Sequence, residues 1–125
     1  MGFRNFFPTQ VVALGPDRDV EAAGGGMKIR GKTRNPFAPG ASVVAAIRPD
    51  DVMVGGDAAG PNAFRAKVDI VEYLGREDEA IVTLEAGGRL WVRTGARVTP
   101  GEHVTVVLPP DRVIFLPAEG SGGTA

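Results

Sequence analysis

One segment of this chain occurs twice, and that repeat constrains the fold more than any other feature of the sequence. Residues 39–54 align without a gap on residues 100–115, a shift of 61 positions (39 to 100). The identical pairs are Pro39/Pro100, Gly40/Gly101, Val43/Val104, Pro49/Pro110, Asp50/Asp111 and Val52/Val113. Upstream, at a shift of 57 (5 to 62), the matching pairs are Asn5/Asn62, Phe7/Phe64 and Val11/Val68. The sequence therefore predicts two copies of one small unit.

Each copy reads as short strands joined by tight turns. Its apolar residues come in blocks such as 43–47 and 104–108, bounded by glycine and proline. Blocks of this length are typical of strands, and the 18 glycines and 10 prolines of the chain supply the turns. We therefore expect an all-β fold of two tandem OB-like barrels, over about residues 6–54 and 63–116, related by approximate twofold pseudosymmetry.

Alternating charges predict a hairpin near the N-terminus. Acids occupy positions 17, 19 and 21, and bases occupy positions 28, 30 and 32. Each acid faces a base in an antiparallel hairpin in which the numbers of facing residues add up to 49, as in 21 and 28. That register makes Gly24-Gly25 the turn and sets Val20 opposite Ile29. The bases, with Arg34, could form a binding strip or half of a solvated ion ladder, and the facing acids favour the ladder. Gly87-Gly88 predicts a second hairpin, between residues 80–85 and 89–93.

The alternation of apolar and polar residues along these strands also predicts which side chains face the interior. The expected buried residues are Val11, Val20, Ile29, Val43, Ile47, Val68, Ile70, Val82, Leu84, Val92, Val104, Val106 and Phe115. This set is distributed over both copies of the repeat.

Charge and composition disfavour several classes of function. A net charge of −1 and a pI of about 5.8 give no electrostatic reason to expect nucleic acid or an anionic membrane as partner. Cysteine is absent, and His103, the single histidine, is expected at the surface. The sequence has no GxxxxGK[ST] phosphate loop, so we expect no ATP binding of that kind and no enzyme activity. The lack of a signal-peptide pattern and of a long apolar run indicates a soluble, cytosolic chain.

Two motifs in a characteristic order resemble a known family. Residues 47–50, Ile-Arg-Pro-Asp, lead from a strand into a turn, and residues 71–75, Val-Glu-Tyr-Leu-Gly, end a later strand. Together they resemble the TOBE (transport-associated OB) domain, in which glutamate is commoner than aspartate at the fourth motif position. Residues 90–93 and 101–104 fall where that family has its next two strands. The similarity spans about residues 1–117.

The resemblance implies a non-catalytic regulatory and dimerisation domain at the C-terminal end of the ATP-binding subunit of an ABC importer. Residues 1–8 are then expected to be the junction from an absent ATPase domain, residues 9–117 the TOBE domain, and residues 118–125 a flexible tail. This chain would hold no cofactor, because ATP and Mg²⁺ belong to the absent ATPase domain. The motifs suit sugar, polyamine and ferric-iron importers alike, so the solute stays open.

The resemblance also implies partners and motif residues. The expected partners are the ATPase domain of the same subunit, a second copy in a homodimer, indirectly the membrane permease, and a small-molecule regulator, with no nucleic acid. The expected location is cytoplasmic, peripheral to the inner membrane. The structural or regulatory candidates are Arg48, Pro49, Asp50, Glu72 and Gly75, none of them catalytic. Arg48 and Glu72 are expected to form a structural ion pair or to anchor a turn.

Two other functions fit parts of the sequence. A free-standing protein with paired OB-like units could bind a small oxyanion through backbone amides and basic residues at the interface between the repeats. An OB-type nucleic-acid binder would need exposed aromatic residues and a basic groove. Most of the eight aromatic residues (six Phe, one Trp, one Tyr) are expected in the core, and the charge balance is unfavourable. The oxyanion-binding protein is therefore the main alternative to a regulatory domain.

Overall fold

The computed structural model describes residues 5–55, 61–95 and 97–118, and within these it consists of β-strands and two short 3-10 helices. The elements are β1 (Asn5–Leu14), β2 (Asp19–Gly24), β3 (Met27–Thr33), β4 (Ser42–Ile47), η1 (Pro49–Asp51), β5 (Met53–Val54), β6 (Ala63–Tyr73), β7 (Asp78–Leu84), β8 (Arg89–Thr94), β9 (His103–Val107), η2 (Pro110–Arg112) and β10 (Ile114–Pro117). The predicted all-β class is confirmed. Residues 1–4 of the expected junction and 119–125 of the expected tail lie outside the described residues, while residues 5–8 are part of β1.

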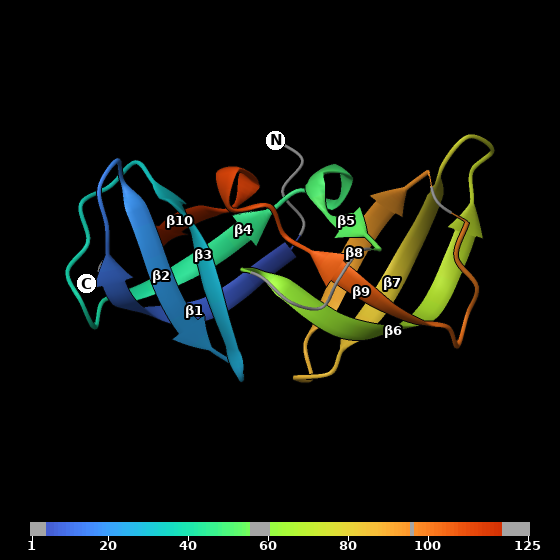
Figure 1. Ribbon diagram of the computed structural model, residues 1–125, viewed down its shortest axis with the longest axis horizontal. Coiled ribbons are helices and arrows are strands. Elements are labelled where there is room, and N and C mark those ends of the chain that lie inside the picture. Colours follow the sequence, from blue (N-terminus) through green and yellow to red (C-terminus); the bar gives the residue numbers. More distant parts are fainter. Residues whose placement is uncertain (1–4, 56–60, 96, 119–125) are drawn as a thin grey trace.

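Two five-stranded sheets lie side by side along the long axis of the molecule (Figure 1). The first is a closed barrel in the order β1-β2-β3-β10-β4, and the second sheet has the order β5-β9-β6-β7-β8. Four strands of each sheet come from one half of the sequence, but β5 and β10 are exchanged. β5 pairs with β9, and β10 pairs with β3 and β4. The two sheets therefore do not coincide with the two halves of the sequence.

The sequence repeat is also a structural repeat. η1 and η2 stand at the same shift of 61 as the sequence match, and Gly40 and Gly101 share a φ of +88°. The N–H groups of these two glycines donate to the carbonyl oxygens of Val11 and Val68, both at 2.7 Å. β1 and β6 each carry a bulge directly after those two valines. The predicted repeat is confirmed at the level of individual backbone conformations.

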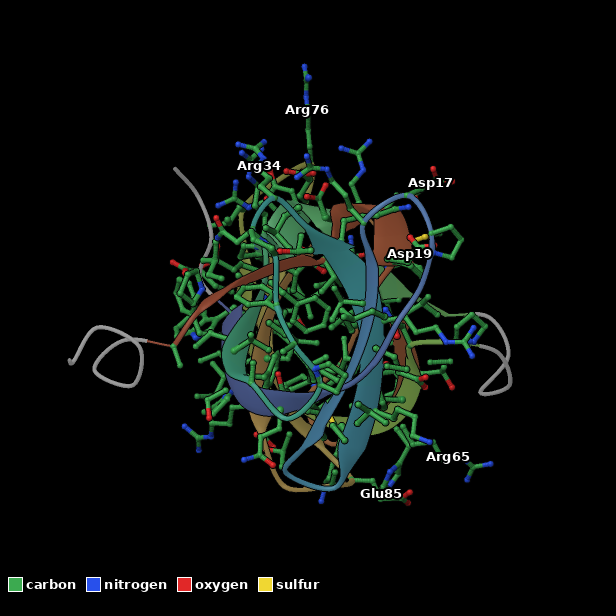
Figure 2. The ribbon with its side chains drawn as sticks, turned by 90° about the vertical axis from the view of Figure 1, so that its left-hand side faces the viewer. Asp17, Asp19, Arg34, Arg65, Arg76 and Glu85 are labelled. Carbon is green, nitrogen blue, oxygen red and sulfur yellow. The ribbon has the colours of Figure 1, made fainter. Side chains whose placement is uncertain are left out.

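The first hairpin forms, but its register differs by two from the predicted one. Paired positions sum to 51, as in Asp19↔Lys32 and Glu21↔Arg30, and not to 49. Because the difference is even, every side chain keeps its predicted face. Lys32 Nζ lies 2.5 Å from Asp19 Oδ1, and Arg30 Nε lies 3.9 Å from Glu21 Oε2. Two acid–base pairs thus form in the shifted register instead of the predicted three, while Lys28 faces Ala23 and Asp17 lies outside β2. Figure 2 shows Arg34 at the periphery, pointing outward.

Three consecutive glycines explain the difference in register. The turn residues are Gly25 and Gly26, with φ of +58° and +81°, and a two-residue type I′ turn requires positive φ at both positions. Gly24 is the last residue of β2, where a Cβ would lie 2.4 Å from the carbonyl oxygen of Pro8. It is needed for a close approach of two strands and not for the turn. The second predicted hairpin, between β7 and β8, is confirmed.

The burial prediction holds for most of the expected set and fails at one position. Apart from Val104 and Ile70, every residue of that set is buried, and Val104 is partly buried against the core. Ile70 is 57% exposed, so its predicted burial is wrong. The bulge between Val68 and Ile70 adds a residue to β6 and turns the following side chains to the opposite face.

The exchanged strand β10 is part of the core of the first barrel. A Cβ on Gly31 of β3 would lie 2.7 Å from the carbonyl oxygen of Val113 and 2.9 Å from Cε2 of Phe115. The Lys32 N–H donates to the same carbonyl oxygen of Val113 at 2.9 Å. Only glycine leaves room for this approach, so the second half of the chain is required to complete the barrel built by the first.

Candidate functional site

The two Pro-Asp turns of the repeat lie at the junction of the sheets. η1 packs on β8 of the second sheet, and η2 packs on β3 of the first. Each turn begins with a proline, whose fixed φ suits the first helical position and whose missing N–H is not needed there. In η1 the Asp51 N–H donates to the carbonyl oxygen of Arg48 at 3.0 Å. Each turn thus carries its half of the chain across to the other sheet.

Two buried asparagines connect the sheets beside these turns. The Asn62 amide accepts a hydrogen bond from the Arg30 N–H and donates to the Arg30 and Leu108 carbonyl oxygens, each at 2.7 Å. Asn5, its counterpart in the repeat, accepts from the Trp91 N–H at 2.7 Å and donates to the Trp91 carbonyl oxygen at 2.8 Å. Each amide satisfies the backbone of a strand edge, as a neighbouring strand would.

A charged cluster links η1 to the second sheet. Arg93 Nη2 on β8 lies 3.0 Å from Glu79 Oε2, and its Nη1 lies 3.6 Å from Asp50 Oδ1 in η1. The hydrogen bond to Glu79 raises the pKa of Arg93, and the negative charge of Asp50 adds to the effect. This side chain therefore joins a turn from the first half of the chain to a sheet built mainly by the second.

The first barrel holds the counterpart of that cluster, which the identity pattern of the repeat did not reveal. Lys32 stands 61 positions before Arg93, and Asp111 stands 61 positions after Asp50. The hydrogen bond from Lys32 to Asp19 raises the pKa of Lys32 above its usual 10.5, and Asp111 adds to the effect. The Lys32 ammonium group is in contact with solvent, so its interactions with Asp19 and Asp111 add little to stability. We therefore infer that their role is to orient the turn η2.

The five motif residues do not converge on one site. Pro49 is buried in η1, Asp50 belongs to the charged cluster, and Arg48 contributes its carbonyl oxygen to the turn. Glu72 is exposed on β6, and Gly75 follows that strand with a φ of +97°. In the part of the chain that the structure describes, the ion pairs do not join Arg48 to Glu72.

The described residues show no cluster of metal-ligand type. None of their His, Cys, Asp and Glu side chains gather in a group of three or more that could hold a metal ion. His103 is exposed on β9, as the sequence predicts. The helices of the described residues are too short and too polar to cross a membrane.

Comparisons with known proteins identify relatives of sequence and of fold. The model of a family described as the TOBE domain matches residues 45–116. The spermidine/putrescine import ATP-binding protein PotA of Rubrobacter xylanophilus is 35% identical in an alignment 113 residues long that covers 85% of this chain and 29% of that protein. This chain therefore spans less than a third of the length of that relative.

A solved structure shares the fold. It is the cytoplasmic molybdate-binding protein ModG with molybdate bound, which superposes with a TM-score of 0.79 over 94% of this chain and 99% of that chain. The two sequences are 21% identical. The likeness agrees with the predicted pair of OB-like units.

Proposed function

Because the chain belongs to the TOBE-domain family, we propose that it is the regulatory domain of an ABC-importer ATP-binding subunit and performs no catalysis itself. The observation that carries this proposal is the match to an importer ATP-binding protein over 85% of this chain but 29% of the relative. A match of that extent is what a domain within a longer subunit produces. The family match includes both motifs on which the sequence resemblance rests.

In this role the domain acts as a rigid connector. The exchanged strands and the two asparagines tie both sheets into one body, so the surfaces at its two ends keep a fixed separation. A connector of this kind keeps two ATP-binding subunits together while their nucleotide sites open, because it maintains a high effective concentration of one site near the other. The ATPase domain of the same subunit binds ATP and Mg²⁺, and a second copy and the permease complete the cytoplasmic assembly.

The name of the relative supports spermidine or putrescine as the transported solute. The sequence motifs by themselves suit sugar and ferric-iron importers as well. We therefore propose a polyamine on the strength of that relative and assign no polyamine contact to this chain.

The absence of nucleotide chemistry in this chain has a direct test. We expect the purified chain to show no ATPase rate and the same mass in sedimentation equilibrium with and without Mg²⁺-ATP, since the sequence has no phosphate loop. Weak self-association independent of nucleotide agrees with the proposal. A nucleotide-dependent change in mass, or an ATPase rate above that of buffer, contradicts it.

The alternative, a free-standing oxyanion-binding protein, is supported by the fold of the molybdate-bound structure. It would place the anion between the repeats, where Lys28, Arg30 and Asn62 border a hollow of about 330 Å³. Two of these groups are already engaged, Arg30 with Glu21 and the Asn62 amide with backbone. Calorimetric titration with molybdate separates the two functions. Tight binding that Lys28→Gln abolishes supports the oxyanion-binding protein. The absence of binding supports the regulatory domain.

A further inference from the structure

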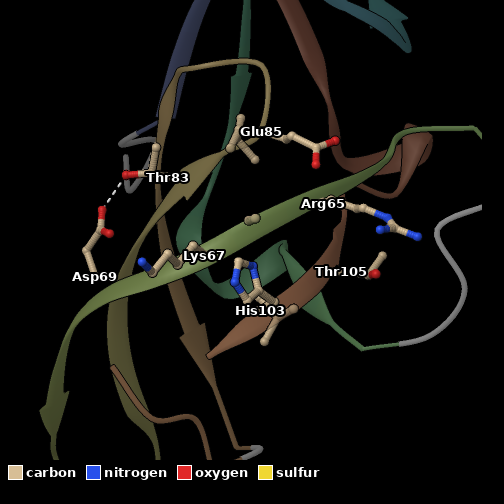
Figure 3. A pocket seen from close by; sticks show the side chains of 10 residues that line it. Arg65, Lys67, Asp69, Thr83, Glu85, His103 and Thr105 are labelled. Carbon is tan, nitrogen blue, oxygen red and sulfur yellow. Dashed lines mark hydrogen bonds between the residues drawn. The ribbon is translucent and has the colours of Figure 1, made fainter. Parts of the chain in front are cut away.

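The outer face of the second sheet carries a hollow that the proposed function does not use. It measures about 650 Å³ and lies over β6, β7 and β9 (Figure 3). The polar side chains that border it are Arg65, Lys67, Asp69, Thr83, Glu85, His103 and Thr105. It is larger than the hollows of about 460 Å³ and 330 Å³ that border the first hairpin.

Basic and acidic side chains both border this hollow. Across the β6–β9 ladder Lys67 stands opposite His103, and Arg65 stands opposite Thr105, so four groups with N–H or O–H donors line one ladder. Asp69, also on β6, is engaged by β7, because it accepts a hydrogen bond from the Thr83 hydroxyl. In Figure 3 the Glu85 carboxylate lies across β6 from His103. A ligand over the β6–β9 ladder therefore meets donors.

The basic side chains of this ladder lack the carboxylate partners found on the first hairpin. On the first hairpin, Arg30 and Lys32 each have a carboxylate within 4 Å. Within the residues that the structure describes, Arg65, Lys67 and His103 take part in no ion pair and no side-chain hydrogen bond. The charges of Arg65 and Lys67 are thus available to a ligand, apart from competition by water and salt.

The internal repeat shows that the fold does not need these charges. Six of the seven polar side chains, all but Glu85, lie on β6, β7 and β9. The corresponding positions in the first copy are Pro8, Gln10, Val12, Ala23, Ser42 and Val44. None of the six is charged, although Gln10↔Ser42 and Pro8↔Val44 pair in the same register. Formation of the sheet therefore does not explain the charged groups of the second copy.

We propose that this hollow binds a small oxyanion, a phosphate or a carboxylate-bearing metabolite, over the β6–β9 ladder between Lys67, His103 and Arg65. Charge-assisted hydrogen bonds from Lys67 and Arg65 hold the anion, with the His103 ring N–H and the Thr105 hydroxyl as further donors. The site lies on the outer face of one sheet and is distinct from the junction of the sheets, where the alternative function would place an anion. The inference goes beyond the proposed function, because binding here requires neither an ATPase domain nor a second copy.

The test uses residues that the first copy carries at the same positions. The double variant Lys67→Gln and His103→Ser installs the equivalents of Gln10 and Ser42, so the sheet is expected to keep its fold. Amide chemical shifts are followed by NMR during titration with inorganic phosphate and, separately, with citrate, at constant ionic strength. We expect saturable shifts at residues 65–67 and 103–105, and affinity weakened at least about tenfold in the variant. The ligand with the higher affinity shows whether the hollow prefers a phosphate or a carboxylate.

Arg34→Gln is the matched control, since it removes an exposed positive charge directly after β3, where the residue borders neither this hollow nor the one at the junction of the sheets. It is expected to leave both affinities unchanged. No saturable shift with either anion overturns the proposal. Equal weakening by Arg34→Gln overturns it as well, because the attraction would then be general and not a property of this hollow. Either failure leaves the ATPase and sedimentation tests of the proposed function unaffected.

Discussion

Replacing Phe115 by alanine is expected to lower the free energy of unfolding by about 3–5 kcal/mol, the usual cost of removing a buried phenyl ring. Phe115 is fully buried. It pairs with Ala45 on β4 and Thr33 on β3, so its ring fills the first barrel from a strand that the second half of the chain supplies. The neighbouring residue Gly31 has no side chain that could fill the space left by the ring.

Phe6→Ala is the matched control for that variant, because the Phe6 ring is 53% exposed on β1. We expect a loss below about 1 kcal/mol for the control. Urea unfolding followed by circular dichroism gives both values, and Phe115→Leu, which retains most of the volume, provides a folded intermediate case. Equal losses at Phe6 and Phe115 would show that β10 does not complete the barrel.

Asn62→Ala is expected to cost about 2–5 kcal/mol. Removal of the amide leaves backbone groups of a strand edge unpaired in a buried setting, at about 1–3 kcal/mol. In addition, Asn62 has a φ of +60°, a conformation that asparagine tolerates and that costs alanine about 1–2 kcal/mol. Asn62→Gly removes the backbone contribution and retains the loss of the hydrogen bonds, so the two variants separate the causes.

Two other asparagines provide controls for this prediction. Asn5→Ala loses the equivalent pair of hydrogen bonds without the positive φ, so a smaller loss is expected than at Asn62. Asn35 is exposed, and Asn35→Ala is expected to change stability by less than about 0.5 kcal/mol. Thermal and urea unfolding rank the three. If Asn62→Ala lowers the free energy of unfolding no more than Asn35→Ala does, the asparagines do not stabilise the connection between the sheets.

The sequence contains the repeat, and from it the all-β class, both hairpins and most of the core follow. Matching backbone conformations at Gly40 and Gly101 require the same residue at the same offset, which makes them visible as identities. The faces of the first hairpin are equally predictable, since side chains alternate whichever of the glycines 24–26 form the turn. The exact register is not predictable there, because three consecutive glycines permit two turns, and the packing of Gly24 against Pro8 decides between them.

The exchange of β5 and β10 could not be read from the repeat. Two identical units have the same sequence pattern whether the last strand of each unit pairs within its own sheet or within the sheet of the other unit. A signal for the connection was present in the Asn5/Asn62 match, but a buried amide that pairs with a strand edge leaves no periodicity. The Lys32 and Arg93 clusters were hidden because the two copies use different cations. Ile70 was misplaced because a bulge has no sequence rule as strong as alternation.

The central proposal is that this domain holds ATP-binding subunits together. It predicts a longer subunit that contains this chain behind an ATPase domain, and that subunit provides the most direct test. Sedimentation equilibrium without nucleotide compares that subunit with a form that lacks residues 5–118. We predict a dimer for the complete subunit, and a monomer for the shortened form that dimerises only when ATP is added, because the connector no longer keeps the two copies close. Identical association of the two forms without nucleotide would contradict the claim.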